Sequence, residues 1–255
     1  MKRPFTYHLA RLVRTLSLVP RPHTTAVILA GGVGSRMGEA QSVAKQWIKI
    51  GGRTILERSV AAFEACPHID EIVVVVRRGE GESAAKILRA MGTRKVRAVV
   101  SGGKTRQHSA YNGARRASGK TRYIAIHDAA RPFVSPEDIS AVVTTAYSEK
   151  AASLGTPVFD TVKRVNRLNY IVETKERNEL WLAATPQVFS YPMYLSAATA
   201  ALKAGRSVTD DNMLMEGLGQ RVRMVAAKSE LLKVTTPRDL VRAEAIAAAE
   251  PKEGS

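Results

Sequence analysis

The sequence is poor in cysteine: Cys66 is the single one among 255 residues, so no internal disulfide bond can form. So low a cysteine content fits a reducing compartment, and we expect a cytoplasmic protein. Cys66 precedes Pro67 at the end of a helical pattern, which favours a buried structural thiol over a nucleophile.

Aromatic residues and long apolar runs are also scarce. Aromatic content is 5%, and the chain has no helix-turn-helix, RNP-like or zinc-finger pattern. We therefore expect no dedicated nucleic-acid binding, although the net charge of +16 suits a protein that handles phosphates. The apolar patch at residues 9–19 is interrupted by Arg11 and Arg14 and is too short to span a bilayer, so no membrane association is expected.

Acidic residues are absent before Glu39, whereas five basic residues lie before Thr24: Lys2, Arg3, Arg11, Arg14 and Arg21. This segment lacks a clean apolar core with a small-residue cleavage site, which disfavours a secretory signal. An organelle transit peptide, or a tail from an upstream start codon, stays open. We assign residues 1–24 to a disordered basic extension, 25–249 to a single domain and 250–255 to a polar tail.

The chain is arranged around a glycine-rich loop. A short apolar run at residues 26–29 is typical of a buried parallel strand, and it ends at three glycines: Gly31, Gly32 and Gly34. Such a loop approaches a ligand closely and offers backbone N–H groups to anions, and the cations Arg36 and Lys45 follow it. The string is neither a P-loop nor a dinucleotide fingerprint. As a whole, LAGGVGSRMG resembles the signature of sugar-nucleotide and polyol-phosphate nucleotidyltransferases.

Apolar strands alternate with amphipathic helices after this loop. We predict strands at 71–76, 96–100, 123–126 and 152–157, and helices at 54–65, 82–91, 106–117, 136–147 and 191–204. This alternation predicts an α/β fold with a mostly parallel sheet covered by helices on both faces. Loops that follow parallel strands share one sheet edge, so Gly31, Gly102 and Asp128 should converge on one crevice.

The pattern changes in the second half of the chain. Residues 159–173 alternate around a turn and predict a β-hairpin, the core of an arm at about 158–176. An isolated hairpin is marginal in water, so we expect the arm to pair with a second copy in a homodimer. Late strands are predicted at 222–226 and 232–235, and a closing helix at 237–249.

Further motifs sharpen the resemblance. HDAARPF at residues 127–133 combines with Lys45-Gln46, Gly102-Gly103, Thr185-Pro186-Gln187, Thr209-Asp210-Asp211 and Lys233-Val234-Thr235, in order along nearly the whole chain. Together they resemble the 2-C-methyl-D-erythritol 4-phosphate cytidylyltransferases of non-mevalonate isoprenoid biosynthesis. The resemblance implies a Rossmann-like nucleotidyltransferase fold and transfer of CMP from CTP to a polyol phosphate, with Mg²⁺ as cofactor and pyrophosphate as product.

The resemblance also implies roles for individual residues. Catalytic groups would be Arg36, Lys45 and Lys233, and Asp128 would hold the metal. Nucleotide-binding groups would be Ala30, Gly31, Gly32, Gly34, Gly103, Ser109 and Ala129. The polyol phosphate would be held by Arg131, Thr161, Arg177, Thr185 and Thr209, with Arg177 reaching over from the arm of a partner subunit. His127 is expected to pack behind its loop.

The residue types suit this chemistry independently. The attacking group is already a phosphate, so the site must neutralise two polyanions and align them rather than supply a strong base. Two alternatives stay open: a ribitol-5-phosphate cytidylyltransferase, and a catalytically weakened relative that binds nucleotides or polyanions. The second is motivated by the net charge of +16 and by the altered Arg36–Lys45 segment, which is longer than in the family and has Ala44 in place of proline. Lys104 also departs from the family pattern, at a position that bears on base or ribose recognition.

Overall fold

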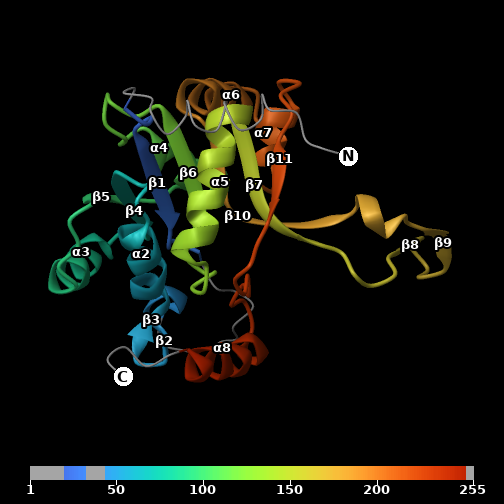
Figure 1. Ribbon diagram of the computed structural model, residues 1–255, viewed down its shortest axis with the longest axis horizontal. Coiled ribbons are helices and arrows are strands. Elements are labelled where there is room, and N and C mark those ends of the chain that lie inside the picture. The colour runs from blue at the N-terminus through green and yellow to red at the C-terminus, as the bar shows by residue number, and fades with distance from the viewer. Residues whose placement is uncertain (1–19, 33–43, 251–255) are drawn as a thin grey trace, which may run out of the picture.

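The computed structural model describes residues 20–32 and 44–250 (Figure 1). In this part of the chain a seven-stranded sheet has the order β11-β7-β10-β6-β1-β4-β5. Its strands are β1 (Thr24–Leu29), β4 (Glu71–Val76), β5 (Val96–Ser101), β6 (Tyr123–Asp128), β7 (Ala151–Pro157), β10 (Trp181–Ser190) and β11 (Arg223–Ala226). Gly34 and Arg36 of the glycine-rich loop, most of the basic extension and most of the tail lie outside the described residues.

One half of the sheet is wholly parallel. β1 lies between β4 and β6, with Val27 opposite Val73 on one side and Ile126 on the other, and β5 pairs with β4. Every residue of β4 is buried, as a continuous β-branched run predicts for a strand covered on both faces. The carboxyl ends of these four strands therefore meet at one edge.

Helices cover both faces of the sheet. One core cluster joins the sheet to α2 (Ile55–Ala65), α3 (Gly81–Ala90) and α5 (Pro136–Glu149), and the α5 helix crosses the near face in Figure 1. The other joins it to α4 (Arg106–Ala114), α6 (Tyr191–Lys203) and α7 (Asn212–Glu216). A smaller third cluster packs α8 (Pro237–Ala249) on the hairpin of β2 (Lys49–Ile50) and β3 (Arg53–Thr54).

Local sequence explains several helix ends. Thr54 caps α2 by accepting from the Glu57 N–H at 3.1 Å while the Glu57 carboxylate accepts from the Thr54 N–H, the predicted capping box. The α4 helix stops at Ala114, three residues short of the prediction. A Cβ on Gly113 would lie 2.4 Å from Val27 Cγ1, so this glycine lets α4 pack closely on β1.

Further features differ from the sequence prediction. Residues 232–235 form no strand; the segment is irregular, although the Val234 N–H donates to the Ala130 carbonyl at 2.8 Å. β10 was not predicted, because Pro186 lacks the N–H that a central strand needs, and the strand accommodates it where its register with β7 shifts between Ala183 and Gln187. The short α7 was also missed.

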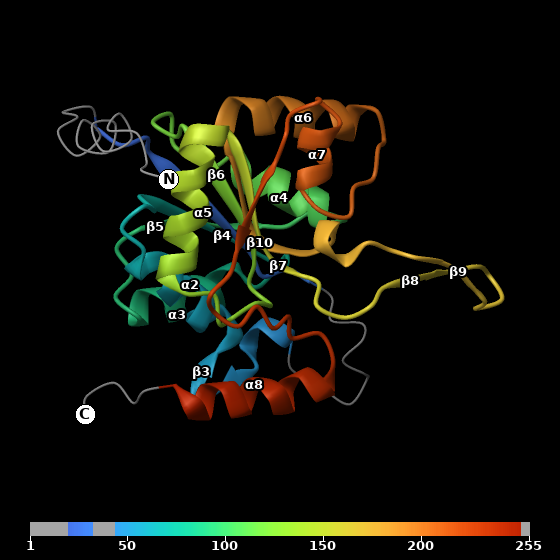
Figure 2. The ribbon, with the colours of Figure 1, turned by 45° about the vertical axis from the view of Figure 1, so that its right-hand side comes forward.

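A hairpin extends away from the body of the domain (Figure 2). It consists of β8 (Lys163–Val165) and β9 (Ile171–Thr174), both within the predicted arm, and a 3-10 turn at Arg177–Glu179 follows just beyond the predicted end of the arm. It joins β7 to β10, which runs antiparallel between β6 and β7. Within the described residues, each helix falls short of the length and apolarity needed to cross a bilayer.

Candidate active site

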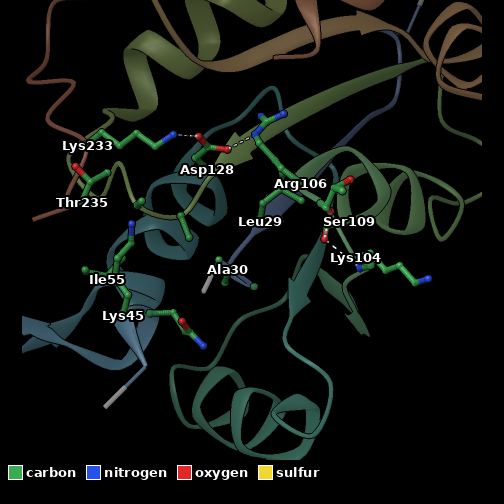
Figure 3. Close-up of a pocket in the computed structure, with 17 residues that line it drawn as sticks. Leu29, Ala30, Lys45, Ile55, Lys104, Arg106, Ser109, Asp128, Lys233 and Thr235 are labelled. Carbon is green, nitrogen blue, oxygen red and sulfur yellow. Dashed lines mark hydrogen bonds and ion pairs between the residues drawn. The ribbon is translucent and has the colours of Figure 1, made fainter. Parts of the chain in front are cut away.

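A cavity of about 340 Å³ lies at the carboxyl edge of the parallel half of the sheet (Figure 3). Its walls come from the ends of β1 and β6, the loop after β5, the 3-10 turn η2 (Lys45–Trp47) and the segment before α8. The predicted convergence of the loops after these strands is therefore confirmed. Four described cationic side chains line it, Lys45, Lys104, Arg106 and Lys233, whereas Asp128 is the one acidic side chain among the described lining residues.

The first glycine loop forms one wall through its backbone. The Ala30 N–H donates to the Val75 carbonyl at 2.7 Å, which ties the start of the loop to the neighbouring strand. A Cβ on Gly31 would lie 3.4 Å from the Val76 carbonyl carbon, so the loop runs close against β4. Ala30, Gly31 and Gly32 all line the cavity, as predicted for this loop.

The second glycine loop forms the opposite wall. The Gly103 N–H donates to Ser109 Oγ at 3.0 Å, and a Cβ on Gly103 would lie 2.4 Å from His108 Cβ, so glycine is required there. Gly103 and Ser109 both line the cavity. The Lys104 side chain extends away from Asp128 in Figure 3 and is exposed.

Asp128, at the end of β6, is clamped by two cations. Lys233 Nζ lies 2.7 Å from its Oδ2 and Arg106 Nε lies 2.9 Å from its Oδ1. Burial alone would raise the pKa of Asp128, but the charges of Arg106 and Lys233 hold that pKa well below its usual range. The Asp128 carboxylate is therefore ionised across the physiological range.

Arg106 is a site residue that sequence reasoning missed. It also pairs with the buried Asp211, whose Oδ2 lies 2.6 Å from Arg106 Nη1, while Tyr194 donates to the other oxygen at 2.9 Å. Burial opposes the charge of Arg106, yet the two carboxylates raise its pKa above the ordinary value. A signal was present, because Arg106 lies three residues after Gly103, in the second glycine turn that the topology brings to the cavity.

Lys45 lines the cavity from η2, next to Ala44, where the resemblance leads us to expect proline. Ala44 has φ −60° and ψ 138°, which is the backbone conformation that proline itself would impose. The substitution therefore leaves the approach of the chain to Lys45 in a proline-like conformation. Arg36, predicted to act with Lys45, lies outside the described residues.

The residues predicted to hold the polyol phosphate do not line this cavity. Thr161, Thr209 and Arg177 are exposed, and Arg177 Nη1 donates to the Phe159 carbonyl at the base of the arm at 3.0 Å. Arg131 is partly buried, and its Nη1 donates to the Leu231 carbonyl at 2.6 Å. Thr185 is 4% exposed and accepts from the Asp128 N–H at 3.0 Å, so it supports Asp128 from behind.

His127 lies behind the cavity, as predicted. It is fully buried, its ring centroid is 4.9 Å from that of Phe63, and its Nδ1 is 3.1 Å from Thr185 Oγ1. Burial lowers the pKa of His127 to about 4, so the imidazole is neutral at physiological pH. Its burial and its position beneath the loop separate it from a reacting group in the cavity.

The donor set fits a magnesium ion that arrives with a nucleotide. The described residues contain no cluster of three or more His, Cys, Asp or Glu side chains that could hold a metal by themselves. Mg²⁺ at nucleotide sites is commonly held by one or two carboxylates together with substrate phosphates and water. The ionised Asp128, facing a cavity rich in cations that suit phosphates, meets that requirement.

Comparison with known proteins gives one consistent result. The family model of 2-C-methyl-D-erythritol 4-phosphate cytidylyltransferase matches residues 24–249. The curated protein of that name from Desulforamulus reducens is 44% identical over 221 residues, covering 86% of this chain and 94% of the relative. Its counterpart from Pelotomaculum thermopropionicum is 40% identical over 222 residues, covering 87% of this chain and 92% of that protein.

Solved structures agree. The crystal structure of 4-diphosphocytidyl-2C-methyl-D-erythritol synthase from Anaerococcus prevotii has a TM-score of 0.79 at 28% identity, and the match covers 89% of this chain and 96% of that one. The predicted Rossmann-like nucleotidyltransferase fold is thereby confirmed. The chain belongs to the 2-C-methyl-D-erythritol 4-phosphate cytidylyltransferase family, a family of nucleotidyltransferases.

Proposed function

We propose that the protein transfers CMP from CTP to 2-C-methyl-D-erythritol 4-phosphate and that this cavity is its active site. A phosphate oxygen of the polyol phosphate attacks the α-phosphorus of CTP, the bond from that phosphorus to the bridging oxygen breaks, and pyrophosphate leaves. The observation that carries the proposal is the set of cations around one ionised carboxylate at the carboxyl edge of the sheet, in a chain of this family. Such a site neutralises the two anions and aligns them.

The nucleotide side is formed by the two glycine loops. Backbone groups of Ala30, Gly31, Gly32, Gly103 and Ala129, with the Ser109 hydroxyl, surround the space for cytosine and ribose. Lys45 and Lys233 offset the charge on the α-phosphate and the leaving pyrophosphate, together with Arg36 and the backbone of Gly34. Because Lys233 already pairs with Asp128, its ammonium group is held at the cavity before the nucleotide binds.

Asp128 is the residue that would hold Mg²⁺. When bound, the ion neutralises phosphate oxygens and orients the triphosphate. The chain's own contribution is geometric: Thr185 fixes the Asp128 backbone, and Arg106 and Lys233 fix the carboxylate.

We also place the enzyme in the cytoplasm, where its one cysteine, the buried Cys66, would stay reduced.

We propose that the arm pairs with a second copy of the chain. Large apolar side chains on and beside it are exposed: Phe159 (79%), Leu168 (75%), Tyr170 (68%), Ile171 (64%) and Leu182 (64%). Exposed apolar residues gathered on one projecting segment mark an interaction surface. In a dimer, Arg177 and Thr161 would complete the partner's site with Arg131, Thr185 and Thr209.

The dimer is tested by measuring mass in solution with light scattering. The wild type should run as a dimer, whereas Leu168→Asp with Ile171→Asp should run as a monomer. Val241→Asp is the matched control, because Val241 is 73% exposed on α8, away from the arm. A monomeric wild type would overturn this part of the proposal.

The activity is tested by pyrophosphate release from CTP and Mg²⁺, with methylerythritol phosphate and ribitol 5-phosphate offered in parallel. We expect release with the first substrate and its loss in Lys45→Ala. The control is Lys49→Ala, which removes an exposed lysine outside the cavity. A preference for ribitol phosphate would replace the substrate, and salt-sensitive retention on DNA without turnover would favour a polyanion-binding protein.

A further inference from the structure

The turn between β4 and α3 holds two walls of the cavity without lining it. Arg77 Nη2 donates to the Gly32 carbonyl at 3.1 Å, at the end of the first glycine loop. Three residues later, Glu80 Oε2 accepts from Gln46 Nε2 at 2.5 Å, at the turn that carries Lys45. Gly32, Lys45 and Gln46 line the cavity, whereas Arg77 and Glu80 are absent from the described lining.

The Glu80 carboxylate accepts several hydrogen bonds in addition to the one from Gln46. Its Oε2 also accepts from the Arg77 N–H at 3.3 Å, and its Oε1 accepts a long hydrogen bond from Trp47 Nε1 at 3.4 Å. Its own N–H donates to the Arg77 carbonyl at 3.1 Å. Gly79, with φ +91°, provides the left-handed conformation that this tight turn needs. The turn is thus internally fixed and carries its carboxylate at a defined place.

Gln46 links Glu80 to the cavity. The residue is 3% exposed, so its amide has little access to water and Glu80 satisfies a nearly buried donor. Without that acceptor the amide would be left unpaired or would turn towards another partner, at the cost of a lost hydrogen bond. Gln46 is the middle residue of η2 and Lys45 is its first, so the hydrogen bond to Glu80 anchors the turn that presents Lys45 to the cavity. The position of Lys45 therefore depends on a side chain from a different strand–helix connection.

We propose that Glu80 is a positioning residue for nucleotide binding, setting Lys45 relative to the glycine loop that Arg77 holds at Gly32. The inference rests on the proposed function, because it assigns Lys45 to the triphosphate. The groups that Glu80 contacts belong to Gln46, Trp47 and its own turn, and none of them is assigned to the polyol phosphate. Replacing Glu80 should therefore weaken CTP binding more than polyol-phosphate binding.

The test compares Glu80→Ala with Glu64→Ala in steady-state kinetics. Glu64 is a matched control, since its carboxylate likewise accepts several N–H donors, those of Arg94 and Lys95, but lies outside the cavity. For Glu80→Ala we expect the KM for CTP to rise roughly 10- to 100-fold, with the KM for the polyol phosphate within about twofold of wild type. Glu64→Ala should leave both KM values unchanged.

Three further measurements separate positioning from loss of folded protein. In a Lys45→Ala background, Glu80→Ala should raise the KM for CTP by less than about twofold, because the residue it positions is gone. Glu80→Gln keeps one acceptor oxygen, so it should give an intermediate KM, and it replaces Glu80→Ala if that variant does not fold. CTP affinity measured by calorimetry should follow the same order without turnover.

The outcomes are distinguishable. A wild type that releases no pyrophosphate overturns the proposed function itself. A wild type that is active while Glu80→Ala lowers kcat with the KM for CTP unchanged, or matches Glu64→Ala, overturns the positioning role alone. Full additivity of Glu80→Ala and Lys45→Ala would also overturn it, because Glu80 would then act on CTP independently of Lys45.

Discussion

The two halves of the sheet divide the work of the site. The parallel half, β5-β4-β1-β6, ends at one edge, and its loops supply most of the cavity wall. The other half, β10-β7-β11, contains the antiparallel β10 and carries the arm. Its residues hold the cavity from behind: Thr185 accepts from the Asp128 N–H, and Gln187 accepts from the N–H of Asp211, the partner of Arg106.

This division suggests how the sheet edge that carries the cavity is held in place. A parallel sheet brings the loops that follow its strands together at one edge. The antiparallel strand crosses beside β6 and offers side chains that satisfy the buried polar groups there. Substitutions in the parallel half should therefore affect chemistry first, whereas substitutions in the other half should affect stability first.

The largest effect is expected from Asp128→Asn. Removal of the negative charge releases Lys233 and takes away the carboxylate proposed for the metal, so kcat/KM should fall by about 10²- to 10³-fold. The rate of pyrophosphate release at saturating Mg²⁺ gives this kcat/KM. Asp70→Asn is the control: Asp70 pairs with Arg21 at the opposite edge of the sheet, and its loss should leave kcat/KM unchanged.

The next effect concerns His127, which joins the two halves through Thr185. Its pKa is lowered from 6.5 to about 4, so between these values the unfolded chain binds a proton that the folded chain does not. Stability should therefore fall as the pH drops from about 6.5 towards 4, by on the order of 3 kcal/mol from this group.

Urea unfolding between pH 7.5 and 4.5 measures the slope. His127→Asn keeps a group able to bond Thr185 but does not titrate, so its stability should change less steeply with pH than that of the wild type. Parallel curves for the two proteins would show that His127 is not held neutral by burial.

A smaller effect is expected from Tyr194→Phe, on the α6 helix behind β10. Tyr194 is 1% exposed, and its hydroxyl donates to the buried Asp211 carboxylate at 2.9 Å. Loss of a hydrogen bond to a charged group should lower the free energy of unfolding by about 2 kcal/mol. Tyr123→Phe removes a longer bond, 3.3 Å to the Tyr147 carbonyl, and should lower it less. If Tyr194→Phe keeps full stability but loses activity, the claim that substitutions in the β10-β7-β11 half affect stability first is wrong.

The smallest effect is expected from a substitution in the parallel half that should lower stability and leave catalysis unchanged. Thr54→Ala removes the N-cap of α2 and should lower the free energy of unfolding by about 1 kcal/mol, with both KM values unchanged. Thr144→Ala is the control, because Thr144 Oγ1 donates to carbonyls of the preceding turn of α5. Thermal unfolding measures both, and a changed KM for CTP in Thr54→Ala would show that α2 contributes directly to the site.

Sequence reasoning located most of the parallel half and the loops at its edge. β1, β4, β5 and β6 are short apolar runs bounded by glycines or polar motifs, so each can be predicted from its own local sequence. β10 does not, because Pro186 breaks the local pattern of a central strand and its partners are distant in sequence. The predicted strand at 232–235 is wrong for a related reason, since alternating apolar residues there pack in a loop rather than pair in a ladder.

Local sequence was enough to predict the α/β class, the glycine-rich loops at the sheet edge and the family, because backbone freedom at glycine and the period of apolar residues are local properties. Tertiary structure alone decided that Arg106 clamps Asp128, that Thr185 supports it from behind, and that Glu80 reaches Gln46. These contacts join residues separated by 22, 57 and 34 positions. Side chains so far apart meet only after the strands have paired, so no local pattern encodes their contact.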